Sequence, residues 1–98
     1  MAIMMSSAQV AARAQEIDEL NAQFKAQVNS LEEKEGSLKS MYEGDAATAF
    51  HNAFTRDKVQ MDNFYNCIAQ YAAVLREIAS RMEQAEAINR ETATTRAY

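Results

Sequence analysis

Large apolar residues recur at every seventh position through the first part of the chain. This row runs without a slip and comprises Val10, Ile17, Phe24, Leu31 and Leu38. A less regular second row holds Ala14, Leu20, Val28 and Met41. A repeat of seven is typical of an α-helix that packs lengthwise against another helix. With Ser6 or Ser7 as a capping residue, the pattern predicts a helix from about residue 7 to about residue 41.

The second part of the chain has the same repeat in two rows. One row holds Phe54, Met61, Ile68, Leu75 and Met82, and its companion holds Phe50, Asp57, Phe64, Tyr71, Ile78 and Ala85. Only Asp57 interrupts the apolar character of these rows. The pattern predicts a helix over about 46–89, with Asp45 as its N-cap. Residues 90–98 lack periodicity, and we expect them to form a disordered tail.

The two predicted helices are separated by the short segment Tyr42-Glu43-Gly44-Asp45. Gly44 can adopt backbone conformations that strain other residues, so it is suited to a helix end. So short a connection, over residues 42–45, forces neighbouring long helices into an antiparallel hairpin. We therefore expect a single all-α domain over residues 1–98, built as an antiparallel helical hairpin.

Folding the chain about this turn brings together positions whose numbers sum to 88. The resulting pairs are Leu38 with Phe50, Phe24 with Phe64, Ile17 with Tyr71, and Val10 with Ile78. Leu31 opposite Asp57 does not fit this scheme. The pairing predicts that the Phe50 row faces the first helix, which leaves the row from Phe54 to Met82 largely uncovered.

An uncovered row of large apolar side chains is costly, because burying each one stabilises a protein by roughly 1.5–3 kcal/mol. A second hairpin packed on this row would complete a four-helix bundle. We expect a homodimer, or a heterodimer with a related hairpin protein.

Composition and charge exclude several classes of protein. The 98 residues include two glycines and no proline, which favours helix, and the net charge of −4 argues against nucleic-acid binding. Cys67 is the only cysteine, so an intramolecular disulfide is excluded. The apolar run over residues 2–5 is too short for a signal peptide, and no stretch approaches a membrane span. We expect a soluble protein made in the cytosol that, if it is exported, leaves the cell without a classical signal peptide.

The sequence offers little that could perform catalysis. The single histidine, His51, has no evident partner, and the acidic run of Glu32, Glu33 and Glu35 is typical of a solvated helix face. No zinc spacing, phosphate-binding glycine loop or nucleophile motif is present. We therefore expect no enzymatic activity, cofactor, metal or small-molecule substrate.

The segment LKSMYEGDAA, over residues 38–47, resembles the ESAT-like W-x-G family of small type VII secretion substrates. The match rests on a leucine four residues before the central aromatic, a glycine two residues after it, and Phe50 and Phe54 in the following turns. Tyr42 stands where the family has tryptophan. The resemblance covers residues 7–89 and implies export of a folded dimer by a bacterial membrane ATPase machine.

The resemblance also implies an export signal, because many members carry Tyr-x-x-x-Asp/Glu near the end of the second helix. This chain lacks that tyrosine, and Met82 with Glu86 is the candidate variant. Two other functions are compatible with the fold. One is an adaptor or chaperone for a larger secreted toxin, and the other is a cytosolic coiled-coil scaffold.

Overall fold

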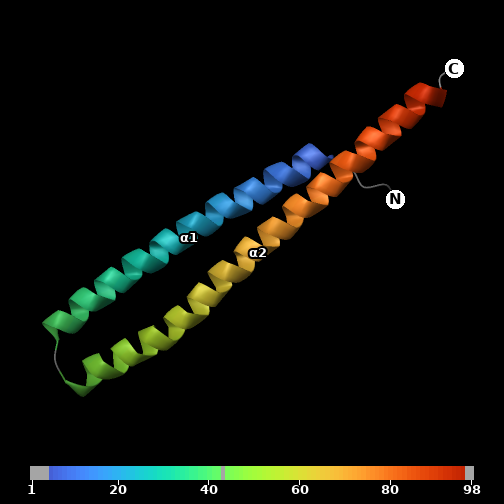
Figure 1. The fold of residues 1–98 in the computed structure, drawn as a ribbon. Coiled ribbons are helices and arrows are strands. Elements are labelled where there is room, and N and C mark those ends of the chain that lie inside the picture. Colours follow the sequence, from blue (N-terminus) through green and yellow to red (C-terminus); the bar gives the residue numbers. More distant parts are fainter. Residues whose placement is uncertain (1–4, 43, 97–98) are drawn as a thin grey trace.

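The protein is an elongated antiparallel hairpin of two helices, α1 (Ser7–Met41) and α2 (Asp45–Arg96) (Figure 1). This computed structural model describes residues 5–42 and 44–96. The principal extents are 82 × 20 × 16 Å. The predicted all-α antiparallel hairpin is therefore confirmed. α2 is the longer helix and continues past the beginning of α1 (Figure 1).

Local hydrogen bonds define both ends of α1. Ser6 is the N-cap: its side-chain oxygen accepts a bond from the Gln9 backbone N–H at 3.2 Å, while the Gln9 side chain accepts one from the Ser6 N–H at 2.8 Å. This reciprocal capping box satisfies amides that the first helical turn leaves unpaired. At the other end, Tyr42 is extended, and its N–H donates to the Leu38 carbonyl at 3.0 Å.

Gly44 is the residue that joins the turn to α2. Its φ of +114° lies in the region that side chains rarely allow, as expected for a glycine at this break. The Gly44 carbonyl accepts a bond from the Thr48 N–H at 3.1 Å, so Gly44 occupies the N-cap position. Asp45, which we expected as the N-cap, is instead the first helical residue. Its carboxylate still lies in the first turn, where the helix dipole favours negative charge. Glu43 lies outside the described residues.

The far end of α2 differs from the sequence prediction. The helix continues to Arg96, so the expectation of a disordered tail is wrong for residues 90–96. The prediction relied on apolar periodicity, which a solvated helix does not need. Residues 90–96 contain neither glycine nor proline, and nothing in their sequence therefore ends the helix. Residues 97 and 98 lie outside the described residues.

The two helices meet along a seam of small and polar side chains. In α1 the seam is a strict row of sevens, namely Ser7, Ala14, Asn21, Val28 and Glu35, all of them buried. In α2, Ala72 and Ala79 are buried at 0% and 6% exposure. Small residues at such positions allow two helix backbones to approach closely, because no bulky side chain separates them.

This seam corrects our prediction of which rows face each other. The row of Phe54, Met61, Ile68, Leu75 and Met82, which we expected to be uncovered, is half-buried beside the seam. The row we expected to face α1 is exposed instead, at 57% for Phe50, 56% for Phe64, 60% for Tyr71 and 43% for Ile78. The prediction failed because it placed the largest side chains inside. Of the less regular row that we listed for the first helix, Ala14 and Val28 are buried in the seam, whereas Leu20 and Met41 are exposed at 64% and 74%.

Candidate interaction surface

An apolar face runs along one side of the seam. We define it as two rows, Val10, Ile17, Phe24, Leu31 and Leu38 on α1, and Phe50, Phe64, Tyr71 and Ile78 on α2. The rings of Phe24 and Phe64 pack edge to face with centroids 5.6 Å apart, which confirms that predicted pair and joins the two rows. Leu31 and Leu38 are 49% and 45% exposed. A contiguous apolar surface of this kind marks an interaction site.

Two hollows lie along this face. The central hollow is lined by Ile17, Leu20, Asn21, Phe24, Phe64 and Ile68. The second lies at the turn and is lined by Leu38, Tyr42, Ala46, Ala47 and Phe50, with Glu35 and Lys39. Tyr42 is 64% exposed, so its ring forms one wall of the turn hollow and remains accessible to a binding partner.

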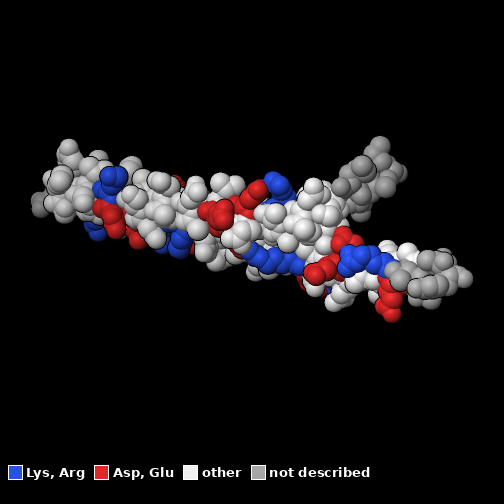
Figure 2. Space-filling view, turned by 90° about the horizontal axis from the view of Figure 1, so that it is seen from above, with Lys and Arg blue, Asp and Glu red and all other residues white. Residues whose placement is uncertain are grey.

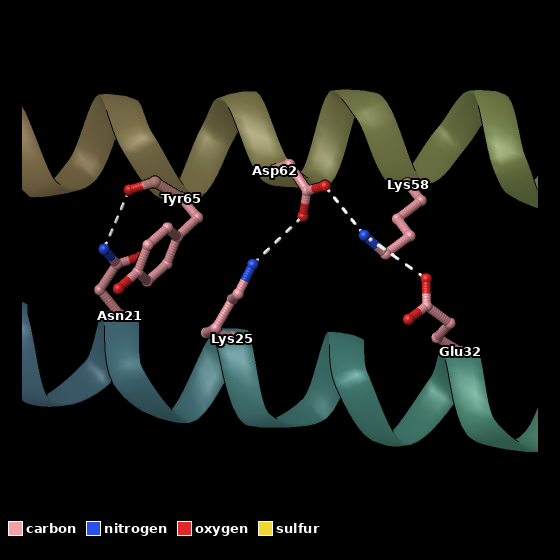
Figure 3. Close-up of polar contacts among 6 residues, drawn as sticks. All are labelled: Asn21, Lys25, Glu32, Lys58, Asp62 and Tyr65. Carbon is pink, nitrogen blue, oxygen red and sulfur yellow. Dashed lines mark hydrogen bonds and ion pairs between the residues drawn. The ribbon is translucent and has the colours of Figure 1, made fainter.

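The opposite side of the seam, which we call the polar flank, is bridged by charged side chains (Figure 3). Asp62 accepts from Lys25 at 3.5 Å and from Lys58 at 3.0 Å, and Lys58 also pairs with Glu32 at 3.4 Å. The hydrogen bond from Lys58 lowers the pKa of Asp62, and the same bond raises the pKa of Lys58. Two of these ion pairs, Lys25 with Asp62 and Lys58 with Glu32, join the helices on this side, and the apolar face lies on the other side.

Charges elsewhere on the surface are mixed. Arg76 pairs with Asp18 across the hairpin, and Arg13 pairs with Glu16 at 2.9 Å along α1. Figure 2 shows acidic and basic side chains in mixed clusters separated by uncharged surface over the described residues in view. No large area of a single sign appears there, so the charge distribution favours local pairing over attraction of a polyanion.

Asn21 is a polar residue in the middle of the seam. Its side-chain N–H donates to the Tyr65 carbonyl at 3.0 Å, beside the Lys25 ammonium, which lies 5.2 Å from the centre of the Tyr65 ring (Figure 3). Its Oδ1 atom is buried and has no partner among the described residues. A buried amide of this type disfavours shifted registers, because any shift would leave more polar atoms unpaired.

A second buried polar contact joins the helices near the turn. The Nδ1 atom of His51 lies 2.6 Å from Oε1 of Glu35, a residue that is only 5% exposed. Our expectations of an unpartnered His51 and of a solvated face including Glu35 are therefore wrong. The clue was present in the sequence, since Glu35 falls on the row of sevens that begins at Ser7.

The candidate export residue Glu86 is bound to the beginning of α1. Its two carboxylate oxygens accept from the Ser7 backbone N–H at 3.0 Å and from the Ser7 hydroxyl at 2.8 Å. Both bonds favour the charged form and lower the pKa of Glu86. Met82, one turn earlier, is half-buried. No local sequence pattern predicts this contact, because its partners are 79 residues apart.

The described residues contain no group of three or more His, Cys, Asp or Glu side chains placed to hold a metal ion. Over the same residues, neither helix has a segment that is long and apolar enough to cross a bilayer. The apolar face, the aromatic–glycine turn and the Glu86 contact are the features of the described residues that bear on an interaction.

These features define a class: a small helical hairpin with one exposed apolar face. The model of the WXG100 family, described as proteins of 100 residues with WXG, matches residues 2–87. The chain belongs to this family of type VII secretion substrates. Tyr42 occupies the position of the tryptophan in the W-x-G motif, and Gly44 occupies the position of its glycine.

Solved structures with the same fold include EsxB of Bacillus anthracis, described as a secreted protein. A selenomethionine-labelled form has 19% identity and a TM-score of 0.78, covering 88% of this chain and 98% of EsxB. A mutant form of EsxB gives the same identity and TM-score over 88% and 96% of the two chains. The wild-type form gives 19% identity and 0.76 over 85% and 95%. A comparison with curated proteins found no match.

Proposed function

We propose that this protein is a small, non-enzymatic substrate of a bacterial type VII secretion system and that it acts as a dimer. The observation that carries the proposal is the exposed apolar face beside the Tyr42–Gly44 turn, in a chain of the WXG100 family. Likeness to EsxB, which is described as secreted, gives further support. In this proposal the protein leaves the cell without a signal peptide and depends on the membrane ATPase of the system.

Covering the apolar face requires a second helical hairpin. The α2 side chains of the apolar face are 43–60% exposed. A partner of similar length would remove much of that area from water. Burial of apolar surface contributes roughly 25 cal/mol per Å². A four-helix bundle formed in this way uses the apolar face as its core and leaves the polar flank at the water surface.

Export is the part of the proposal to test first. The protein is followed in cell pellet and culture supernatant of its own host, with and without the type VII membrane ATPase. We expect ATPase-dependent appearance in the supernatant, and a cytosolic marker measured in the same fractions controls for lysis. Equal retention in both strains would contradict the proposal and favour a cytosolic helical scaffold.

Two variants then separate recognition from folding. Tyr42→Ala removes an exposed ring from the turn, so we expect helical content to be nearly unchanged and export to fall. Val59→Ala, which truncates an exposed residue away from the turn, is the matched control. If Tyr42→Ala instead unfolds the chain, as judged by circular dichroism, the ring has a structural role.

A further inference from the structure

The side of α2 that carries Met82 and Glu86 is partly covered at the beginning of α1. Both residues are half-buried, whereas Glu83, Gln84 and Ala85 between them are exposed. Residues four apart lie on the same side of a helix, so one side of α2 is covered here and the others are open. The candidate export residues therefore lie under cover at the place where α2 continues past the beginning of α1 (Figure 1).

Ser7 is the residue of α1 that holds Glu86. It is 9% exposed, and it donates to both carboxylate oxygens, through its N–H at 3.0 Å and its hydroxyl at 2.8 Å. The N–H of the first residue of a helix has no acceptor within that helix, and the first turn of α1 contains no acidic residue to complement its dipole. Glu86 thus supplies from α2 the negative charge that the N-terminus of α1 favours.

We infer that the Ser7–Glu86 contact is an autoinhibitory latch, which withholds Met82 and Glu86 from a receptor of the secretion machinery until the beginning of α1 is released. The inference rests on the proposed function and adds a means of regulating it. The receptor is defined by the chemistry of the pair, as an apolar pocket for Met82 and a cationic group for the Glu86 carboxylate. While the latch is closed, both oxygens of that carboxylate are engaged by Ser7.

The position of the contact allows it to open by itself. The ion pair of Lys25 with Asp62 lies between the paired parts of both helices, so it cannot open widely without separating the seam. The contact of Ser7 with Glu86 lies instead at the end of the pairing, because α1 begins at Ser7 and residues 87–93 of α2 are exposed. Local opening at the end of a helix pair costs less than opening in its middle.

The consequence for recognition is quantitative. A receptor that needs the free Glu86 carboxylate binds only open molecules, so its apparent affinity is the intrinsic affinity reduced by the open fraction. The seam begins further along α1 at Ala14, which is 0% exposed, and it can stay closed while the first turn is released. Any change that raises the open fraction should therefore strengthen recognition by the same factor, as long as most molecules are closed.

Ser7→Ala in the full chain tests the latch, because it removes one of the two donors and leaves the Glu86 carboxylate in place. Losing a hydrogen bond to a charged group shifts an equilibrium by about ten-fold or more, so we expect the open fraction to rise by that factor. NMR titration of the Glu86 carboxyl carbon should show its pKa rising toward 4.5, since Ser7 is the main cause of its lowering. In the host strain, ATPase-dependent export should become faster.

Two single variants and one double variant are the controls. Ser7→Thr keeps the hydroxyl and should retain both the lowered pKa of Glu86 and the rate of export of the wild type. Ser80→Ala removes an exposed hydroxyl from the hollow that Ser7 also lines, and it should change neither quantity. To separate the latch from a general loosening of α1, Ser7→Ala is combined with Glu86→Gln. The receptor then lacks its carboxylate, and Ser7→Ala should give no increase in export.

Three results overturn the inference: a pKa of Glu86 that Ser7→Ala leaves unchanged, export of Ser7→Ala that is no faster than that of the wild type, or an increase in export that persists with Glu86→Gln. Failure of the proposed function gives a different result. If the wild type itself stays in the cell in both strains, the proposed function fails, and the latch as a regulator of export fails with it. If the wild type is exported and Ser7→Ala is exported no faster, only the latch is lost.

Discussion

At the scale of single residues, the two glycines of this chain have opposite effects. Gly36 lies inside α1 and is exposed, and a methyl group added there would meet no atom within 4 Å. Gly44 also has open space around it, but its φ of +114° strains any other residue. Open space alone therefore does not permit replacement of a glycine, because the backbone conformation must also suit a side chain. Only Gly44 has a conformation that requires glycine.

Gly36→Ala should raise the free energy of unfolding by about 0.5–1 kcal/mol, because alanine loses less backbone entropy in a helix. Urea denaturation measures this as a higher midpoint with an unchanged slope. Gly44→Ala is the opposing control and should lower the free energy of unfolding by about 1–3 kcal/mol. Equal effects at the two positions would contradict the described turn.

Glu86 makes the hairpin sensitive to acid. Hydrogen bonds from the Ser7 N–H and hydroxyl, with a contribution from Arg90, lower its pKa below the ordinary value of 4.5. A carboxyl whose pKa is depressed on folding stabilises the fold fully above its unfolded pKa. That contribution is lost as the pH falls through the folded pKa.

We therefore expect Glu86→Gln to lower the melting temperature at neutral pH, and the difference from the wild type to shrink as the pH falls below about 4.5. Melting followed by circular dichroism across this range gives the comparison. Glu83→Gln makes the same chemical change at an exposed position of α2 and serves as the control. A difference that is independent of pH would mean that the Ser7–Glu86 contact does not form in solution.

At the scale of the elements, the close seam depends on alanine. Ala14 is 0% exposed between the helices, whereas Ala12 is exposed on the same helix. Ala14→Leu should lower the free energy of unfolding by about 1–3 kcal/mol, because a larger side chain forces the helices apart. Ala12→Leu has the same change in chemistry and should have little effect. Denaturant titration of both variants distinguishes packing from helix propensity.

Periodicity and the central glycine were sufficient to predict two helices in an antiparallel hairpin, because these depend on local sequence, but periodicity missed the continuation of α2 over residues 90–96. The face that each helix turns toward the other could not be predicted from the same pattern. Ala14 and Ala72 carry little hydrophobicity, yet their small size selects the seam, and Phe50 and Phe64 are displaced to its side. The contact of His51 with Glu35 depends on which face each helix turns toward the other. The heptad rows alone do not determine that rotation.

At the scale of the whole molecule, an isolated hairpin has little interior. Among the described residues no large side chain is fully buried. Most of the large apolar residues lie on the apolar face or beside the seam, so a single copy gains limited stability from burial. The folded state should therefore depend on association, which links stability to protein concentration.

Phe64→Ala tests this dependence. We expect the dimer dissociation constant to rise by at least about ten-fold, since truncating a central aromatic anchor commonly costs more than about 1 kcal/mol. The melting temperature of the wild type should rise with protein concentration and that of the variant should rise less. Val59→Ala, at a 55% exposed position outside the apolar face, is the control. A concentration-independent melting temperature for the wild type would contradict a stabilising dimer.

The part of α2 that continues past the beginning of α1 has a different consequence (Figure 1). Residues 87–93 are all exposed. An isolated helix of a few turns is marginal in water. Local opening of this end should therefore cost far less than unfolding the hairpin, and amide hydrogen exchange should be fastest there. The end of α2 can then unwind while the paired helices remain folded.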